Sequence, residues 1–230
     1  MQIKGSTFLI TGGSSGIGKA AAKIIIEKGG RAAITARGKE RLEKTAEEIG
    51  AFPINTDVSK PDDINKTYDL FFKRFDKLDC LINNAGIAGG GNLDKLEWED
   101  FNKVYSVNVF GAAMMAKKAA DIFKKQNYGN IINIGSTAGV KGYAGGTVYA
   151  SSKFALRGMT LCWQAELRRY NIRVMCINPS EVRTSFGGRE TEEVSNRLRG
   201  KEIAHAVVSS LEMDDRGFIP EFMVWATNPF

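Results

Sequence analysis

The segment Tyr149-Ala150-Ser151-Ser152-Lys153 places a phenol and an amine four residues apart. On a helix, positions i and i+4 lie on the same face, so the two side chains would project next to one another. An ammonium group near a phenol favours the phenolate and lowers the pKa of the phenol from its reference value of about 10. A tyrosine tuned in this way can exchange protons near neutral pH. The spacing indicates acid–base chemistry at Tyr149, although such pairs also occur by chance.

A glycine-rich segment, Thr11-Gly12-Gly13-Ser14-Ser15-Gly16-Ile17-Gly18, follows the apolar run Phe8-Leu9-Ile10. Glycines at a strand-to-helix turn let the backbone approach a pyrophosphate, and the helix N-terminus adds N–H donors and the positive end of its dipole. The spacing is Gly-x-x-x-Gly-x-Gly rather than the usual Gly-x-Gly-x-x-Gly, and glycines also make ordinary turns. The position between an apolar run and an amphipathic stretch is what favours a dinucleotide site.

The elements that must position these motifs alternate along the chain. Short apolar runs suited to buried strands lie at residues 8–10, 32–35, 80–82, 131–134 and 174–177. A further short strand is expected at residues 51–54, and the last strand near Phe218 to Val224. Helical patterns lie between them, at 17–24, 42–49, Trp98 to Lys125 and Ser151 to Arg169. Continuous apolar runs are typical of a parallel sheet, whose strands need right-handed helical crossovers. We therefore predict an α/β fold: a single doubly wound parallel sheet of Rossmann type with helices on both faces.

Composition bounds the classes of function. The net charge of +6 comes from Lys and Arg interleaved with acids, as in residues 39–44, which indicates solvated helix faces rather than a nucleic-acid surface. The sequence holds no apolar run of the ~18 residues that a membrane span needs and no signal-like N-terminus, so we expect a cytoplasmic protein without membrane association. Three cysteines without a Cys-x-x-Cys pair, and one histidine, indicate neither a disulfide framework nor a metal site.

The two motifs belong to a larger ordered set. It comprises Thr11 to Gly18, Asp57-Val58, Asn83-Asn84-Ala85-Gly86, Asn108 within residues 107–111, Ser136, Tyr149 to Lys153, and Asn178-Pro179 followed by Thr184. In this order the segments resemble the short-chain dehydrogenase/reductase family over essentially the full chain. The resemblance implies one dinucleotide-binding and catalytic domain over residues 1–230, and an NAD(P)-dependent oxidoreductase that interconverts a ketone or aldehyde and an alcohol, as a carbonyl reductase does.

The resemblance also implies four catalytic residues. Tyr149 would be the general acid and base, and Lys153 would lower its pKa and hold the nicotinamide ribose. Ser136 would hydrogen-bond the substrate oxygen. Asn108 would hold a water in a proton relay behind Lys153. Two simpler interpretations stay open: Ser136 as a loop serine, and Asn108 as a polar core residue that bends its helix.

Cofactor contacts are implied at Thr11, Gly12, Ser14, Ser15, Gly16, Ile17, Gly18, Arg37, Asp57, Val58, Asn83, Ala85, Gly86, Tyr149, Lys153, Pro179, Val182 and Thr184. Asp57 and Val58 would contact adenine. The loop of Asn83, Ala85 and Gly86 would pack beside the cofactor, and Val182 and Thr184 would meet the nicotinamide carboxamide. Alternatively, Asn83 and Asn84 fix a turn and Asp57 caps a helix.

The second predicted strand suggests which dinucleotide is bound. It ends Ile34-Thr35-Ala36-Arg37, without the carboxylate that accepts the ribose 2′-hydroxyl in NAD-type sites. A guanidinium at Arg37 suits a 2′-phosphate instead. We therefore expect NADP(H) to be favoured, with NAD(H) possible. In the alternative interpretation Arg37 simply starts the next helix.

Substrate and assembly are less defined. Ser180 stands where the family usually has glycine, and the chain lacks the glycine-rich C-terminal end of 3-oxoacyl-carrier-protein reductases, which weakens that substrate class. A short polar substrate lid is expected around residues 185–200, and its residues do not identify a substrate. Two other functions are a catalytically silent dinucleotide-binding sensor and a nucleotide-sugar epimerase or dehydratase. We expect a homodimer or homotetramer through the two long helices, whose surplus apolar residues are Met114, Met115, Phe154, Leu156, Met159 and Trp163.

Overall fold

The computed structural model describes residues 1–184, 186 and 196–228. At its centre seven strands form one parallel sheet in the order β3-β2-β1-β4-β5-β6-β9. These strands are β1 (Thr7–Thr11), β2 (Arg31–Ala36), β3 (Phe52–Asn55), β4 (Cys80–Asn83), β5 (Gly129–Ile134), β6 (Ile172–Pro179) and β9 (Glu221–Val224). A separate short pair joins β7 (Val182–Arg183) to β8 (Leu198–Arg199). The chain winds outward in both directions from β1 and β4, so the predicted doubly wound parallel fold is confirmed.

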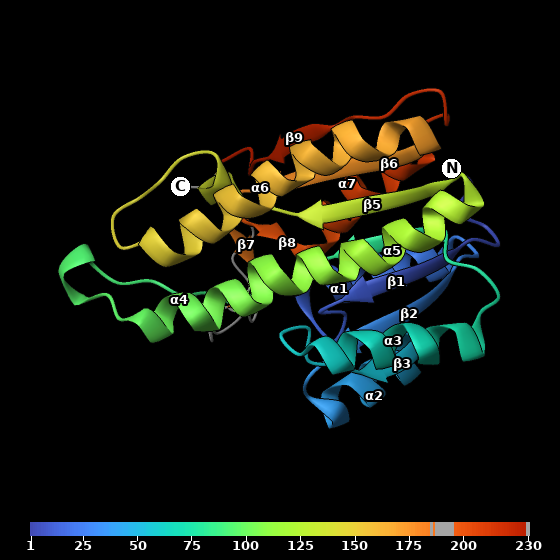
Figure 1. The fold of residues 1–230 in the computed structure, drawn as a ribbon, viewed down its shortest axis with the longest axis horizontal. Coiled ribbons are helices and arrows are strands. Elements are labelled where there is room, and N and C mark those ends of the chain that lie inside the picture. Colours follow the sequence, from blue (N-terminus) through green and yellow to red (C-terminus); the bar gives the residue numbers. More distant parts are fainter. Residues whose placement is uncertain (185, 187–195, 229–230) are drawn as a thin grey trace.

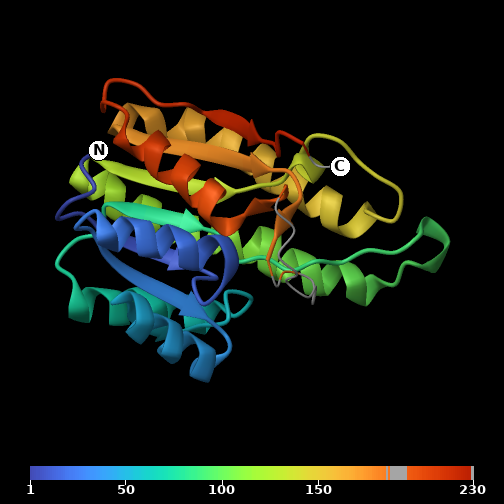
Figure 2. The same ribbon diagram turned by 180° about the vertical axis from the view of Figure 1, so that it is seen from behind.

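Helices cover both faces of the sheet (Figures 1 and 2). On one face lie α1 (Gly16–Glu27), α2 (Lys39–Ile49) and α7 (Gly200–Glu212); on the other lie α3 (Pro61–Arg74), α5 (Ala112–Gln126) and α6 (Thr147–Leu167). Strand side chains alternate between the two cores, so Phe8 and Ile10 pack toward α1 whereas Leu9 packs toward α3. Short helical turns occur at η1 (Leu93–Lys95), η3 (Thr137–Gly139) and η4 (Arg168–Tyr170). None of the described helices is both long and apolar enough to cross a membrane.

The two long helices differ in detail from the sequence prediction. The stretch from Trp98 is α4 (Trp98–Tyr105), then a π-helical turn, η2 (Ser106–Gly111), and then α5. Helix α6 begins at Thr147 rather than near Ser151. It follows directly after Gly145 and Gly146, and Gly145 adopts a positive φ of 75°, which glycine allows at the end of the preceding loop. As a result Tyr149 lies inside the helix that also carries Lys153.

All seven strands end at the same edge of the sheet because they are parallel. Figure 1 shows two segments, residues 88–98 and 141–146, extending beyond that edge. They are joined by a bridge between Gly91 and Gly146 and by a 3.0 Å hydrogen bond from Gly91 N to Gly145 O. Ligands of doubly wound folds bind at this edge, where the strand order reverses. In this chain the reversal lies between β1 and β4.

Candidate active site

The glycine loop between β1 and α1 is pinned to the loop that follows β4. The Asn84 side-chain amide donates to Thr11 O at 2.9 Å and to Gly12 O at 3.0 Å. The Thr11 hydroxyl oxygen accepts from the backbone N–H groups of Asn84 and Ala85, both at 3.0 Å. Gly12 has a φ of 66°, and a Cβ there would lie 2.9 Å from Ala85 Cα. Only a glycine fits this approach, so the loop has a fixed, backbone-lined shape.

The start of α1 offers donors to an anion. Gly16, its first residue, has a φ of 54°, and within the described chain the Ser15 side chain does not cap this helix. A Cβ on Gly18 would lie 2.5 Å from both Gly12 O and Asn84 Nδ2. The loop backbone therefore packs closely on the first turn of α1, whose N–H groups and dipole suit a pyrophosphate. This glycine cradle fits the dinucleotide expected from the sequence.

Helix α6 brings Tyr149 and Lys153 together as predicted, with Lys153 Nζ 5.9 Å from the centre of the Tyr149 ring. The lysine is buried and donates from Nζ to Ile134 O at 2.9 Å. Burial lowers the pKa of Lys153 to about 8, so most of these amines carry a proton at neutral pH. A Cβ on Gly86 would lie 3.7 Å from Nζ, which places the loop after β4 against the same amine.

Ser136 stands just past the end of β5, in extended backbone. Its hydroxyl oxygen accepts from Ala138 N at 3.1 Å, an interaction that does not use the hydroxyl hydrogen. Its backbone N–H donates to Asn178 Oδ1 at 3.2 Å. The turn that follows, η3, packs on α6, and a Cβ on Gly139 would lie 2.8 Å from Lys153 O. Ser136 is thus held at the carboxyl edge beside α6.

Asn108 lies in the π-helical turn and is buried. Its Oδ1 accepts from Ile87 N at 2.8 Å, and its Nδ2 donates to Ile87 O at 3.0 Å and to Ser152 Oγ at 3.1 Å. Both amide hydrogens therefore have protein partners. The side chain ties the π turn to the loop after β4 and to α6, and π turns of this kind often occur at functional sites.

At the other end of the cradle, β2 ends at Ala36 and is followed by the exposed Arg37. Asn55 Nδ2 donates to Ala36 O and Arg37 O, both at 2.9 Å. Asp57 accepts from Ser59 N at 3.0 Å and from Ser59 Oγ at 2.7 Å. Burial raises the pKa of Asp57, but the bonds from Ser59 and the charge of Arg37 outweigh it, so this pKa lies below its usual range. Arg37 and Asp57 thus follow the ends of two paired neighbouring strands, β2 and β3, at the carboxyl edge of the sheet.

Other predicted contacts are placed as follows. Val58 is buried, and its carbonyl would lie 2.6 Å from a Cβ on Gly111. Thr184 packs on the glycine loop, 3.1 Å from where a Cβ on Gly16 would stand. Pro179 ends β6 and Val182 begins β7. The expected lid at 185–200 falls largely outside the described residues; of its described part, the Phe186 ring lies 5.8 Å from that of Tyr149.

Asn83 is the last residue of β4, directly before Asn84. Its buried amide donates to Ala112 O at 3.1 Å and to Asn133 Oδ1 at 3.0 Å, beneath α5. These hydrogen bonds support the alternative interpretation, in which the side chains of Asn83 and Asn84 fix local structure. The packing of the loop of Asn83, Ala85 and Gly86 beside a cofactor stays a prediction.

Ser180 is accommodated without strain, although the family usually has glycine at this position. It is not among the described residues with positive φ. Its backbone N–H donates to Val224 O at 2.8 Å, which joins the end of β6 to the end of β9. A side chain here therefore leaves the local backbone in an ordinary conformation.

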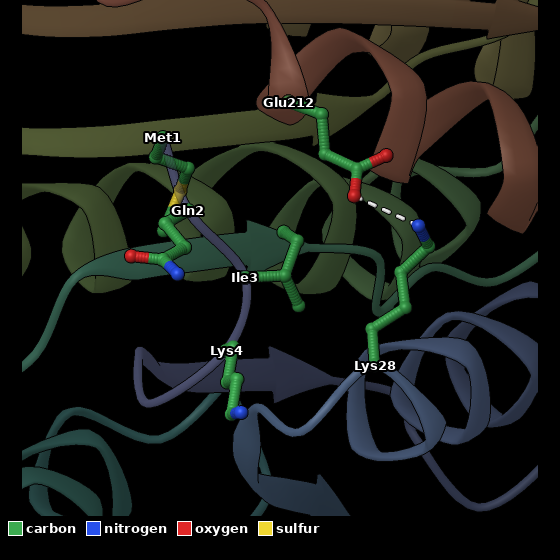
Figure 3. Close-up of a pocket in the computed structure, with 6 residues that line it drawn as sticks. All are labelled: Met1, Gln2, Ile3, Lys4, Lys28 and Glu212. Carbon is green, nitrogen blue, oxygen red and sulfur yellow. Dashed lines mark hydrogen bonds and ion pairs between the residues drawn. The ribbon is translucent and has the colours of Figure 1, made fainter.

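A cavity of about 370 Å³ lies at the opposite, amino-terminal edge of the sheet and is lined by Met1, Gln2, Ile3, Lys4, Lys28 and Glu212 (Figure 3). The Lys28 and Glu212 side chains form an ion pair at 2.8 Å, and both side chains are exposed to solvent. The phenol, amine, hydroxyl and glycine cradle described above gather at the other edge. The carboxyl edge is therefore the candidate active site.

Comparison with known proteins gives a consistent result. The sequence model of the short chain dehydrogenase family matches residues 6–195. An uncharacterised oxidoreductase of Thermotoga maritima is 38% identical over 95% of this chain and 94% of its own. The alcohol dehydrogenase of the archaeon Thermococcus sibiricus, solved with 5-hydroxy-NADP, superposes with a TM-score of 0.91 at 29% identity, covering 97% of both chains. The 3-ketoacyl-(acyl-carrier-protein) reductase of Brucella melitensis, solved with NADH, gives 0.88 at 27% identity, again over 97% of both.

Proposed function

This chain belongs to the short-chain dehydrogenase family, and from that premise we propose that it is a carbonyl reductase that interconverts a ketone or aldehyde and an alcohol. The chain is an oxidoreductase of that family, and a nicotinamide dinucleotide is the cofactor its fold and relatives support. The observation that carries the narrower proposal is the buried Lys153 amine beside the Tyr149 ring, at the edge that also holds Ser136 and the glycine cradle. A protein that only sensed dinucleotides would have no use for this pair.

A bound nicotinamide dinucleotide supplies or accepts the hydride. In reduction, the Tyr149 hydroxyl donates a proton to the substrate oxygen, and the Ser136 hydroxyl hydrogen donates a second hydrogen bond to the same oxygen. The Lys153 ammonium stabilises the phenolate that remains. Asn108 keeps the loop after β4 and Ser152 in place around that amine through its three hydrogen bonds. Residues 1–230 would act as one catalytic domain.

The cofactor would be held by the cradle residues and by the loops around them. The pyrophosphate would face Thr11, Gly12, Ser14, Ser15, Gly16, Ile17 and Gly18. The adenosine would face Arg37, Asp57 and Val58. The loop of Asn83, Ala85 and Gly86 would pack beside the cofactor, and Tyr149, Lys153, Pro179, Val182 and Thr184 would face its nicotinamide half. We propose NADP(H) as the preferred form because exposed Arg37 follows Ala36 at the end of β2, where an acid would select NAD. A charged hydrogen bond of 1.5–3 kcal/mol would favour NADP about 10- to 150-fold.

Calorimetric titration of both cofactors into the wild type and Arg37→Ala tests this preference. Tighter NADPH binding that weakens in the variant is expected. NADH binding as tight as NADPH binding in the wild type would remove the preference. A preference that persists in Arg37→Ala would assign it to other residues.

The substrate can be found by screening aldehydes and ketones against the loss of reduced nicotinamide absorbance. The similarity to the Brucella reductase makes 3-oxoacyl thioesters the second candidate, so acetoacetyl thioesters belong in the screen. Turnover of simple ketones with no thioester activity would favour the carbonyl reductase, and the reverse would favour the thioester class. Tight cofactor binding with no turnover of any carbonyl would favour a silent sensor.

A further inference from the structure

Behind Ser136 lies a chain of hydrogen bonds that reaches the last strand of the sheet. Asn178, fully buried on β6, accepts the Ser136 N–H at its Oδ1 and donates from Nδ2 to Glu221 Oε1 at 2.7 Å. Glu221, on β9, is held in a fork by Arg157, with Nε to Oε1 at 2.6 Å and Nη2 to Oε2 at 3.0 Å. The relay of Arg157, Glu221 and Asn178 thus connects α6, β9 and β6 to the Ser136 backbone.

The order of donors and acceptors in this relay is fixed by the charge of Glu221. A carboxylate only accepts, so the Asn178 amide must turn its NH₂ group toward Glu221 and its oxygen toward Ser136. Arg157 only donates, and its two hydrogen bonds hold the pKa of Glu221 below its usual range, so the group stays ionised. With the amide reversed, two donors would face one another at the Ser136 N–H. A neutral group at position 221 would remove this constraint.

The surroundings allow little freedom to compensate. A Cβ on Gly135 would lie 2.1 Å from Asn178 Oδ1, so the backbone next to Ser136 presses on this amide. The same oxygen accepts from the buried Cys176 thiol at 3.4 Å. Arg157 continues the α6 face that carries Tyr149 and Lys153, one further turn along the helix. The relay therefore contacts the Ser136 backbone at one end and begins one helical turn from Lys153 at the other.

We propose that Glu221, held by Arg157, is a positioning residue for the proposed carbonyl reduction: it fixes the orientation of the Asn178 amide, which in turn holds the Ser136 backbone so that the serine hydroxyl meets the substrate oxygen. The inference rests on the proposed function for its kinetic consequence. Its structural consequence, the hydrogen bond at the Ser136 amide, does not depend on any substrate.

The first experiment is substrate-free. Hydrogen–deuterium exchange of the Ser136 amide, resolved by fragmentation mass spectrometry, is compared in wild type, Glu221→Gln and Glu212→Gln. Glu221→Gln keeps size and removes the charge; Glu212→Gln does the same at the remote ion pair of Figure 3. We expect exchange at Ser136 to rise about 3- to 10-fold in Glu221→Gln and to stay unchanged in the control. Unchanged exchange at Ser136, or an equal rise throughout β5 and β6, would overturn the proposal.

The second experiment separates positioning from general stability. With the activated ketone trifluoroacetophenone as the probe substrate, Glu221→Gln is expected to lower kcat about 3- to 10-fold without changing cofactor affinity, and Glu221→Asp, which keeps the charge, to recover part of the loss. In a Ser136→Ala background the same substitution should change kcat less than about 2-fold, because its effect passes through that serine. Equal losses in both backgrounds would refute the relay. A Ser136→Ala variant as active as wild type would instead refute the proposed role of Ser136.

Discussion

Lys153 combines a buried position with a charge that the proposed chemistry needs. Burial disfavours the protonated form, which is why its pKa falls from 10.5 to about 8. The nearby Cys176 thiol stays protonated in this pH range, because burial raises its pKa to about 11, so it gives the amine no counter-charge. The amine is stabilised by one backbone acceptor, Ile134 O. The cofactor-free protein therefore holds a cation at a cost in stability, as functional sites often do.

That cost predicts a specific pH dependence. Below about pH 8 both folded and unfolded chains bind the proton, and the cost is constant. Between about 8 and 10.5 the unfolded chain binds more protons, so this group makes folding more favourable as pH rises, by an amount on the order of 3 kcal/mol. Urea unfolding at pH 7 and 10 should show the wild type gaining relative to Lys153→Met by part of this amount. A difference between the two proteins that does not change with pH would contradict the prediction.

Tyr149 carries the proton in the proposed reaction, and Tyr149→Phe removes it while keeping the ring. Loss of a general acid typically lowers a rate about 10²- to 10⁴-fold. We expect kcat to fall in that range and the cofactor dissociation constant, measured by titration, to stay near the wild-type value. A variant that kept more than about half of the wild-type kcat, with chemistry rate-limiting, would exclude Tyr149 from this role.

At the scale of elements, the glycine loop packs on the start of α1 through the close approach of Gly18 to Gly12 and Asn84. Gly18→Ala would place a Cβ 2.5 Å from Gly12 O and from Asn84 Nδ2, so the loop must move. Overpacking of this kind costs about 1–3 kcal/mol, and we expect a lower melting temperature together with weaker cofactor binding. Gly158→Ala is the control: a Cβ in the middle of α6 meets nothing within 4 Å, and removing a helical glycine should add about 0.5–1 kcal/mol. Unaltered cofactor affinity in Gly18→Ala would show that the loop is more pliable than this geometry implies.

The helices and strands follow from local sequence patterns. Where the structure differs from the prediction, the cause is a contact between distant residues or a residue that cannot join the sheet. Continuous apolar runs predict the five inner strands of the sheet, since strands covered on both faces lack polar alternation. The edge strands β3 and β9, which are partly exposed, were expected near residues 51–54 and 218–224. The π turn at Ser106–Gly111 was not predicted, because the Asn108 hydrogen bonds that accompany it reach Ile87 and Ser152, which are far away in sequence. The last strand begins at Glu221 rather than near Phe218, after Pro220, which has no N–H for a sheet ladder.

The candidate site likewise has parts that local sequence predicts and parts that depend on contacts between distant residues. The Tyr149 and Lys153 pair and the glycine cradle were predictable because each lies within one short segment. The individual partners of Asn83 and Asn84 were not, since they depend on which face each side chain presents where β4 ends. The Arg157, Glu221 and Asn178 relay joins three separate elements and carries no local motif. Its sequence signals are Asn178, which belongs to the ordered motif set, and the position of Arg157 a turn beyond Lys153; no pattern marked Glu221.

At the scale of the whole molecule, the apolar residues that suggested an oligomer include both buried and exposed side chains. Met115 and Leu156 are core residues and do not contribute to a surface. Met114 and Phe154 are 43% and 42% exposed. Phe110 on η2 and Leu161 on α6, which the sequence did not single out, are 60% and 49% exposed. Helices α5 and α6 contact one another on the same face of the sheet, so these side chains form an apolar surface on adjacent elements.

We propose that this surface pairs with a second copy, as closed two-fold symmetry would allow. Light scattering of the wild type at micromolar concentration should give at least about twice the chain mass of 25.2 kDa. Phe154→Glu combined with Leu161→Glu should lower that mass, because each charge would have to be buried in an apolar contact. Leu93→Glu, on the protruding segment at 81% exposure, is the matched control and should leave the mass unchanged. A wild type of single-chain mass would exclude the dimer, and an assembly that survives the double substitution would place the interface elsewhere.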